Sequence, residues 1–472
     1  MRPFLPLSLA FCAVLALACP VRAANHAMVV AANPLAAAAG LKVLKAGGSA
    51  ADAAVAIQAV LGLVEPQSSG LGGGAFMTFY DAKTHQVRAY NGRETAPAGA
   101  TADMFLEPGG RPMGFAKAVL SGRSTGAPGA VALLALAHKE HGRLPWKSLF
   151  GSAQALADKG FVVSPRLSGF VNNRRIPESN APDITAYFTK PSGGRVQTGD
   201  LLKNRAYADM LRRLAAEGPG ALYGGAVAGE IAARIHADPL PGTLSVADLA
   251  AYRAKETQAL CRPHRAFLVC VPPPPSSGEG LLQALQMLEH TDIAARGPND
   301  PKAWLQFIQA SRLMYADRDR YIGDPDFVSI PLDGLLDPAY VASRAALIGD
   351  VMGLPPVAGT PPGAAPRGPD ASREPGGTSH FVVVDKDGDV VSMTTSVESV
   401  FGSGHMTHGF VLNNQLTDFS FSPVDPNGAQ AANAVAPLKR PRSSMSPVIV
   451  LDQQGRFYAA LGSPGGNSIL AF

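Results

Sequence analysis

The chain has little charge and few cysteines, and each shortage excludes a class of function. Charged residues make up 17% of its 472 residues, the formal net charge is +4, and no block of lysine or arginine occurs. This distribution gives no electrostatic footprint for nucleic acid. There are 4 cysteines, and Cys261 and Cys270 in the body of the chain have no flanking histidine pair, which argues against structural zinc. We expect no metal and no cofactor, and small-molecule chemistry is favoured.

The N-terminal hydrophobic run is too short to cross a membrane. Arg2 precedes apolar residues 5–18, and small residues flank a presumed cleavage point after Val21-Arg22-Ala23. A membrane span needs about 20 apolar residues, whereas this pattern is typical of a secretory signal peptide. We expect residues 1–23 to be a signal peptide and the protein to be periplasmic or secreted, without a membrane span after signal removal. A lipoprotein cleavage box ending at Cys19 is the weaker alternative, because Pro20 follows.

Cys261 and Cys270 are the cysteines that remain after signal removal. Residues 262–265 between them can turn the chain, so the two cysteines are expected on facing strands. A disulfide there would suit an oxidising compartment. Two buried free thiols are an equal alternative.

Apolar patterning predicts a mixed helix and strand fold. Residues 34–64 read as two packed helices, with Gly47-Gly48 ending the first and Ser49 capping the second. The glycine-rich loop at 68–74 lacks the lysine of a phosphate cradle, so its glycines are expected to permit close packing or positive φ. A buried strand is expected directly after it, at 75–80. Further helices are predicted at 130–138, 201–216, 226–237 and 302–317.

A linker followed by a hairpin is the strongest local pattern. Residues 353–377 are rich in Pro, Gly and Ala and predict an exposed linker, where a chain can be cut. Residues 381–395 then predict a hairpin turning at Asp387. With Val384 facing Val390, this register places Thr378 opposite Ser396.

A threonine at a chain terminus can act as a nucleophile without a neighbouring base. Its own α-amine, with an unperturbed pKa of roughly 7.7 to 8.0, takes the hydroxyl proton. Such a residue requires the peptide bond before it to be broken. Gly377-Thr378 joins a flexible linker to a buried strand, as that chemistry needs, although an ordinary strand start is the plain alternative.

The string PGGTSHF at 375–381 resembles the processing site of the gamma-glutamyltransferase family, in which the proenzyme cuts itself before the threonine. Four further motifs resemble the family in order: NGRETAP from 91, LNNQLTDFS from 412, RPRSSMSP from 440 and GSPGG from 462. The resemblance implies that Thr378 is the nucleophile with Ser396 beside it. It also implies that the backbone of Gly465 and Gly466 forms an oxyanion hole.

The same resemblance assigns the substrate's charged groups. Arg93, Ser443 and Ser444 would bind its α-carboxylate, and Gln415, Asp418 and Glu398 its ammonium group. The alternative for Arg93 is a purely structural ion pair with its neighbour Glu94. The alternative for the asparagine-rich segment from 412 is a turn whose side chains cap the backbone. The implied substrates are gamma-glutamyl compounds such as glutathione, with water or an amino-acid or peptide as acceptor.

The resemblance implies the four-layer αββα sandwich of N-terminal nucleophile hydrolases, cut into a large subunit of residues 24–377 and a small subunit of residues 378–472. The connection from Phe419 to Lys439 is short, so a reduced lid and a more open site are expected. The small subunit is shorter than in the family, so we expect either a fragment or unpaired sheet edges.

Other readings stay open. A cephalosporin or glutaryl acylase would share the threonine chemistry. Gly122-Arg123-Ser124-Thr125-Gly126 fits the GxSxG pattern of serine hydrolases, with Ser124 as nucleophile, but Pro128 and Gly129 interrupt the turn into the following helix. His405 and His408 have the spacing of metal ligands, yet glycines surround them. A binding protein of the same fold that has lost turnover is the remaining class.

Overall fold

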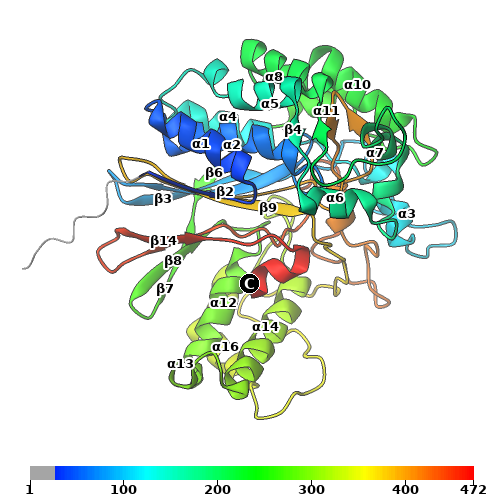
Figure 1. Ribbon diagram of the computed structural model, residues 1–472. Coiled ribbons are helices and arrows are strands. Elements are labelled where there is room, and N and C mark those ends of the chain that lie inside the picture. Colours follow the sequence, from blue (N-terminus) through cyan, green and yellow to red (C-terminus); the bar gives the residue numbers. More distant parts are fainter. Residues whose placement is uncertain (1–26) are drawn as a thin grey trace, which may run out of the picture.

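Two stacked antiparallel sheets form the centre of the molecule, and helices cover both outer faces (Figure 1). The computed structural model describes residues 27–472, so the expected signal peptide lies outside the described residues. The first sheet has six strands, in the order β1 (Met28–Ala31), β9 (Thr378–Val384), β10 (Val390–Ser396), β2 (Gly74–Asp81), β3 (Gln86–Gly92) and β6 (Lys255–Gln258). The second has four, in the order β14 (Phe457–Leu461), β13 (Val448–Leu451), β8 (Phe267–Val271) and β7 (Leu260–His264).

The first helical layer packs on the six-stranded sheet. Helix α2 (Ala50–Val64) is buried along its whole length and contacts β9 and β10. Ser49 caps it in a capping box with Asp52, as the sequence predicts. The other helices that precede β6 are α1 (Pro34–Lys45), α3 (Phe115–Val119), α4 (Ala130–His141), α5 (Gly151–Lys159), α6 (Pro165–Asn172), α7 (Pro182–Tyr187), α8 (Arg205–Glu217), α9 (Gly220–Tyr223), α10 (Gly225–His236) and α11 (Val246–Ala251).

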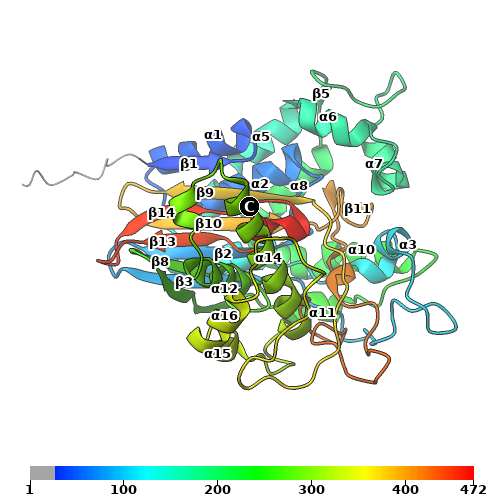
Figure 2. The same cartoon turned by 90° about the horizontal axis from the view of Figure 1, so that it is seen from below.

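The second helical layer covers the four-stranded sheet. Figure 2, seen from below, shows α12, α14 and α16 crossing the strands. Leu282 of α12 packs with Val271 of β8 and Val448 of β13. The layer consists of α12 (Gly278–Glu289), α13 (Ile293–Arg296), α14 (Pro301–Tyr321), α15 (Leu332–Leu335) and α16 (Pro338–Ala345). Together with the facing sheets, this gives the αββα sandwich that the resemblance implies.

The two sheets share a core of their own. Tyr80 and Val390 of the first sheet pack against Cys270, Ile449 and Leu451 of the second. The hydrophobic effect therefore holds the sheets face to face. Cys261 and Cys270 are directly paired on β7 and β8 and form a disulfide, which resolves the two alternatives left by the sequence.

The predicted hairpin has the predicted register. Val384 pairs with Val390, and Thr378 pairs with Ser396. The glycine-rich loop serves close packing rather than positive φ, because a Cβ at Gly73 would lie 2.1 Å from the carbonyl oxygen of Ser396. The loop therefore brings β2 against the end of β10, beside the threonine.

Two local predictions need correction. The helix predicted from Leu201 starts later, because Leu201–Leu202 form β5, which pairs with β4 (Phe161–Val162), and the side chain of Asn204 caps α8. The linker at 353–377 lacks helix and strand, and much of it is exposed, but Glu374 within it is buried at 7% exposure. A short two-stranded pair, β11 (Met406–Thr407) with β12 (Phe410–Val411), completes the strands.

Candidate active site

The hydroxyl groups of Thr378 and Ser396 lie side by side at the end of the central hairpin. Thr378 Oγ1 is 3.2 Å from Ser396 Oγ, and both side chains are buried. Ser396 Oγ donates a hydrogen bond of 3.0 Å to the carbonyl oxygen of Gly377. The backbone N–H of Glu398 donates to the same Ser396 oxygen at 2.8 Å. Two hydroxyl groups, one of which donates a hydrogen bond, and a peptide carbonyl are thus in one place.

The backbone around this group is tightly packed. A Cβ at Gly377 would lie 2.1 Å from the carbonyl oxygen of Glu398, so only glycine fits there. Glu398 itself has φ of 81°, a conformation that residues other than glycine rarely adopt. Strained backbone of this kind clusters at functional sites, where the surrounding structure holds it.

Three polar side chains next to this group touch one another. Gln415 and Asp418 lie on a 3₁₀ turn, η4 (Gln415–Asp418), and Gln415 Nε2 donates to Glu398 Oε2 at 3.1 Å and to Asp418 Oδ2 at 2.9 Å. Each of the three also has a buried oxygen without a hydrogen-bond partner among residues 27–472, namely Glu398 Oε1, Gln415 Oε1 and Asp418 Oδ1. Because unpaired buried acceptors are costly, this cluster is suited to a cationic donor.

Burial and proximity set the charge of the cluster. Burial raises the pKa of Glu398 well above its ordinary value, and the neighbouring Asp418 raises it further. Burial also raises the pKa of Asp418, while Arg93 opposes that shift. Arg93 therefore favours the ionised form of Asp418, whereas burial and the neighbouring Asp418 favour the protonated form of Glu398.

Arg93 joins three segments of the site. It follows β3 and is fully buried, and its Nη2 donates to Asp418 Oδ2 and, at 2.5 Å, to the carbonyl oxygen of Arg442. Its Nη1 has no hydrogen-bond acceptor within the described chain, although Glu94 Oε2 lies 3.8 Å away. Burial raises the pKa of Glu94 to about 8, so this neighbour is mostly neutral at pH 7. Arg93 thus pairs mainly with Asp418 and retains one free donor group.

Ser443 and Ser444 have different surroundings. Ser443 is tied to the backbone, since its Oγ accepts from the N–H of Met445 at 3.1 Å. The backbone N–H of Ser444 instead donates to Glu374 Oε2 at 3.1 Å, and its Oγ accepts from Arg318 Nη2 at 2.8 Å. A carboxylate from the linker therefore occupies a donor that the resemblance assigns to a substrate carboxylate.

The glycine loop near the C-terminal end lies against the same linker. Gly465 and Gly466 have φ of 135° and 57°. A Cβ at Gly466 would lie 2.0 Å from the carbonyl oxygen of Glu374, and one at Gly376 would lie 3.6 Å from Gly465 Cα. The predicted oxyanion loop thus packs directly on the residues that precede Thr378.

All ten residues predicted for catalysis and substrate binding are joined by these contacts into one region, together with Gly377. Sequence reasoning missed Glu374 and its partners Arg318 and Arg442. The available signal was a single glutamate in a linker of proline and glycine, four residues before the threonine.

The structure supports neither the serine hydrolase site nor the metal site that the sequence left open. Ser124 is buried on η1 (Gly122–Ser124), and its hydroxyl donates to the carbonyl oxygens of Val119 and Ser121, so the geometry gives the serine hydrolase reading no support. His405 and His408 face different carboxylates, Asp238 and Glu230. Within residues 27–472, no three side chains gather as metal ligands.

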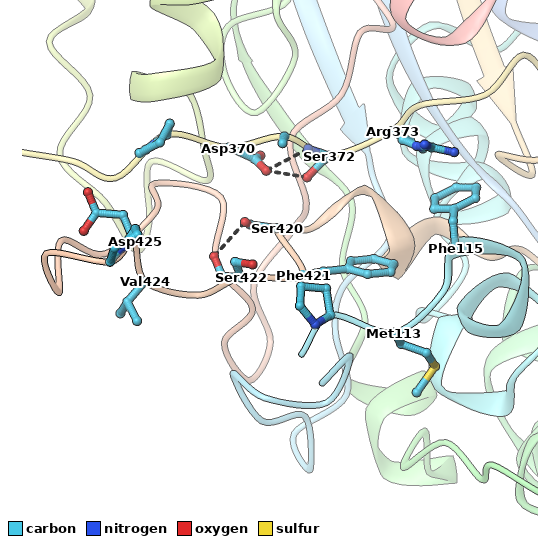
Figure 3. Close-up of a pocket in the computed structure, with 14 residues that line it drawn as sticks. Met113, Phe115, Asp370, Ser372, Arg373, Ser420, Phe421, Ser422, Val424 and Asp425 are labelled. Carbon is cyan, nitrogen blue, oxygen red and sulfur yellow. Dashed lines mark hydrogen bonds between the residues drawn. The ribbon is translucent and has the colours of Figure 1, made fainter. Parts of the chain in front are cut away.

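A pocket of about 730 Å³ adjoins the linker (Figure 3). Its walls are residues 369–373, just before Glu374, and residues 420–426, just after η4, with Phe115 and Phe421 as aromatic surfaces. The segment 420–426 belongs to the connection that was expected to form only a reduced lid. The pocket therefore lies between the linker and the segment that follows η4.

Comparison with known proteins supplies independent findings. The family model described as Gamma-glutamyltranspeptidase matches residues 36–472. The chain is 38% identical over 462 residues to the glutathione hydrolase proenzyme of Escherichia coli (strain K12), covering 96% of this chain and 77% of that protein.

Solved structures of related proteins superpose on this chain. The gamma-glutamyltranspeptidase of Helicobacter pylori superposes with a TM-score of 0.65 at 32% identity, covering 69% of this chain and 92% of that one. The cephalosporin acylase of Bacillus halodurans superposes with a TM-score of 0.78 at 27% identity, covering 100% of this chain and 82% of that one.

Proposed function

The chain belongs to the gamma-glutamyltranspeptidase family, and on that premise we propose that it is a self-cleaving proenzyme that hydrolyses or transfers gamma-glutamyl groups. The cut falls between Gly377 and Thr378 and gives a large subunit of residues 24–377 and a small one of residues 378–472. The observation that carries the proposal is the hydrogen bond from Ser396 Oγ to the Gly377 carbonyl oxygen, with Thr378 Oγ1 3.2 Å from the same Ser396 oxygen.

Self-cleavage is an acyl shift followed by hydrolysis. The Thr378 hydroxyl oxygen bonds to the Gly377 carbonyl carbon, the bond from that carbon to the Thr378 nitrogen breaks, and the hydroxyl proton ends on that nitrogen. Ser396 stabilises the charge that develops on the carbonyl oxygen, as an oxyanion donor does. Water then hydrolyses the ester, which frees the Thr378 hydroxyl, the Thr378 amine and a carboxylate on Gly377.

Turnover uses the amine that self-cleavage creates. With an unperturbed pKa of roughly 7.7 to 8.0, the α-amine of Thr378 accepts the hydroxyl proton while the oxygen attacks the gamma-carbonyl of the substrate. The backbone N–H groups of Gly465 and Gly466 stabilise the oxyanion. The leaving amine takes the proton, and water or an acceptor amine then resolves the gamma-glutamyl ester on Thr378.

The substrate's two charged groups account for the polar cluster. The unpaired oxygens of Glu398, Gln415 and Asp418 support their role as acceptors for an α-ammonium group. The free Nη1 of Arg93 supports its role toward the α-carboxylate, which it would share with Ser443 and Ser444. A molecule that carries both groups on one carbon fits this arrangement better than a glutaryl compound, which lacks the ammonium.

The test has two stages. Intact mass spectrometry of the expressed chain and of Thr378→Ala should give two fragments split before Thr378 in the first and one chain in the second. The matured protein should then cleave a gamma-glutamyl anilide faster than a glutaryl anilide. Faster glutaryl cleavage would instead assign the protein to the acylases of the superfamily, and a folded chain that stays uncut would refute the proposal.

Export is the remaining part of the proposal. Residues 1–23 act as a signal peptide that delivers the protein to the periplasm or the medium, where the disulfide between Cys261 and Cys270 is stable. No helix within residues 27–472 is long and apolar enough to cross a membrane. Cell fractionation, with the N-terminus of the mature large subunit sequenced, tests this location.

A further inference from the structure

Glu374 fastens the linker four residues before Thr378, and Asp370 fastens it further upstream, where its Oδ2 accepts from Asn433 Nδ2 at 2.9 Å and lies 3.1 Å from Arg442 Nη2. Glu374 Oε1 accepts from Arg318 Nη2 at 2.5 Å and lies 3.7 Å from Arg442 Nε. Its Oε2 accepts the backbone N–H of Ser444 at 3.1 Å, and its backbone carbonyl accepts the N–H of Asn467 at 3.0 Å. The residue is thus held from three segments that are distant in sequence.

Glu374 is buried although neighbouring residues in the linker are exposed. Arg373 before it and Gly376 after it are exposed, whereas Glu374 is buried at 7% exposure. A carboxylate that is buried in a linker of proline and glycine must be paired. Arg318 and Arg442, themselves buried, provide that pairing.

The charge of this contact is stable. Burial alone would raise the pKa of Glu374, but Arg318 and Arg442 overcome that effect and lower it to about 2. Arg318 is itself fixed, since its Nε donates to Ser277 Oγ at 2.8 Å. The linker is therefore attached to a rigid part of the fold, at the end of α14, throughout the physiological pH range.

The tether from this attachment to the reacting atoms is short. Only Pro375, Gly376 and Gly377 separate Glu374 from Thr378. At the far end, the Gly377 carbonyl must stay 3.0 Å from Ser396 Oγ for the hydroxyl pair to act on it. Two glycines give this tether little stiffness of its own, so its position depends on where it is held.

We propose that Glu374 is a positioning residue for self-cleavage, whose carboxylate, gripped by Arg318, Arg442 and the Ser444 N–H, holds the Gly377 carbonyl against Ser396 and Thr378. This inference rests on the proposed self-cleavage. Misplacing reacting groups by about 1 Å can cost on the order of 100-fold in rate. Loss of the carboxylate should therefore slow the cut even though Glu374 touches none of the reacting atoms.

The rate of self-cleavage tests the inference directly. The full chain is synthesised in a cell-free system with a short radioactive pulse, and the first-order appearance of the two fragments is followed. Glu374→Gln keeps the shape and removes the charge, and its rate should fall at least 10-fold. The exposed neighbour offers a matched control, Arg373→Ala, which should cleave within about twofold of the wild-type chain.

A double variant separates positioning from charge balance. If Glu374 only neutralises Arg318, then Arg318→Gln combined with Glu374→Gln restores both thermal stability and cleavage. If Glu374 positions the linker, the double variant regains the melting temperature, measured in a Thr378→Ala background. It still cleaves at least 10-fold more slowly than the wild-type chain.

The opposing outcomes are distinct. Cleavage of Glu374→Gln at the wild-type rate, or recovery of the rate together with stability in the double variant, would overturn this inference alone. An uncut wild-type chain would overturn the proposed function itself.

Discussion

The Ser396 hydroxyl donates a hydrogen bond to the Gly377 carbonyl oxygen, across the end of the hairpin formed by β9 and β10. The same hydroxyl oxygen is 3.2 Å from Thr378 Oγ1 and accepts the N–H of Glu398. One side chain therefore contacts both the hydroxyl proposed as the nucleophile and the peptide group proposed to be cleaved. The consequences can be measured on the cleavage step, before any substrate is involved.

Two replacements of Ser396 should show whether self-cleavage depends on its hydroxyl group or on the size of its side chain. Ser396→Ala removes the donor to the Gly377 carbonyl and should slow self-cleavage on the order of 100-fold, the usual cost of one oxyanion donor. Ser396→Thr keeps a hydroxyl and should remain within about threefold of wild type. The fraction of cut chain is followed by intact mass spectrometry, and an alanine variant as fast as the threonine variant would contradict the role given to Ser396.

Two adjacent glycines offer a matched comparison. An alanine Cβ at position 377 would lie 2.1 Å from the Glu398 carbonyl oxygen, whereas the nearest atom to one at position 376 is 3.6 Å away. Gly377→Ala should therefore displace the scissile carbonyl and accumulate as uncut, folded chain. Gly376→Ala should cleave within a fewfold of wild type. Electrophoresis of freshly made protein distinguishes them, and equal processing of both variants would refute the packing argument.

Asp418 and Glu398 should differ in their effect on stability. Asp418→Asn leaves buried Arg93 without its ionised partner and should lower the free energy of unfolding by about 3–5 kcal/mol. Because burial and Asp418 favour the protonated form of Glu398, Glu398→Gln should exchange one neutral group for another and cost about 1 kcal/mol or less. Urea unfolding of both variants in a Thr378→Ala background provides the measurement. Equal losses would show that Glu398 is ionised.

The same two variants test substrate recognition when the matured forms are assayed. Asp418→Asn replaces a charged acceptor for the substrate ammonium by a neutral one and should raise KM for a gamma-glutamyl anilide by at least tenfold, because about 1.4 kcal/mol corresponds to that factor. Glu398→Gln keeps a neutral acceptor and should raise this KM less. A glutaryl anilide lacks the ammonium, so its KM should change little. Parallel increases for both substrates would place the two residues outside ammonium binding.

His380 should make stability depend on pH. Burial lowers its pKa to about 4, while an unfolded histidine titrates near 6.5. The unfolded chain therefore binds the proton first, so the contribution of neutral His380 is complete above about pH 6.5 and is lost as the pH falls toward 4, at most about 1.4 kcal/mol per unit. Urea midpoints of Thr378→Ala between pH 7.5 and 4.5 should fall more steeply than those of the same chain with His380→Gln. Parallel curves would exclude His380 as the cause.

The hairpin was predictable because its information is local. A turn at Asp387 between two apolar runs sets the register of every pair, and Thr378 opposite Ser396 follows from it. The disulfide was left open, because spacing alone does not show whether two facing cysteines are close enough to bond. The helix predicted from Leu201 was wrong because Asn204 is a capping residue, which starts the helix after it.

The burial of Glu374 could not be predicted from the sequence, for a different reason. Nothing near it in sequence indicates burial, and its partners Arg318 and Arg442 come from α14 and from the segment after residue 440. A charged side chain can be buried when it forms ion pairs with residues that are distant in sequence, and composition does not show which residues the fold brings together. The ten predicted site residues were found through motifs, whereas the contacts that join Arg93 to Asp418 emerged only from the fold.

Strand β9 pairs with β1, and β10 pairs with β2, so the hairpin that follows Gly377 lies between strands that precede it in one sheet. Once the Gly377–Thr378 bond is cut, the two pieces stay associated through these backbone ladders without a covalent link. A matured molecule that unfolds must then reassemble from two separate polypeptides, and its recovery becomes concentration dependent, whereas the uncut chain refolds as a single molecule.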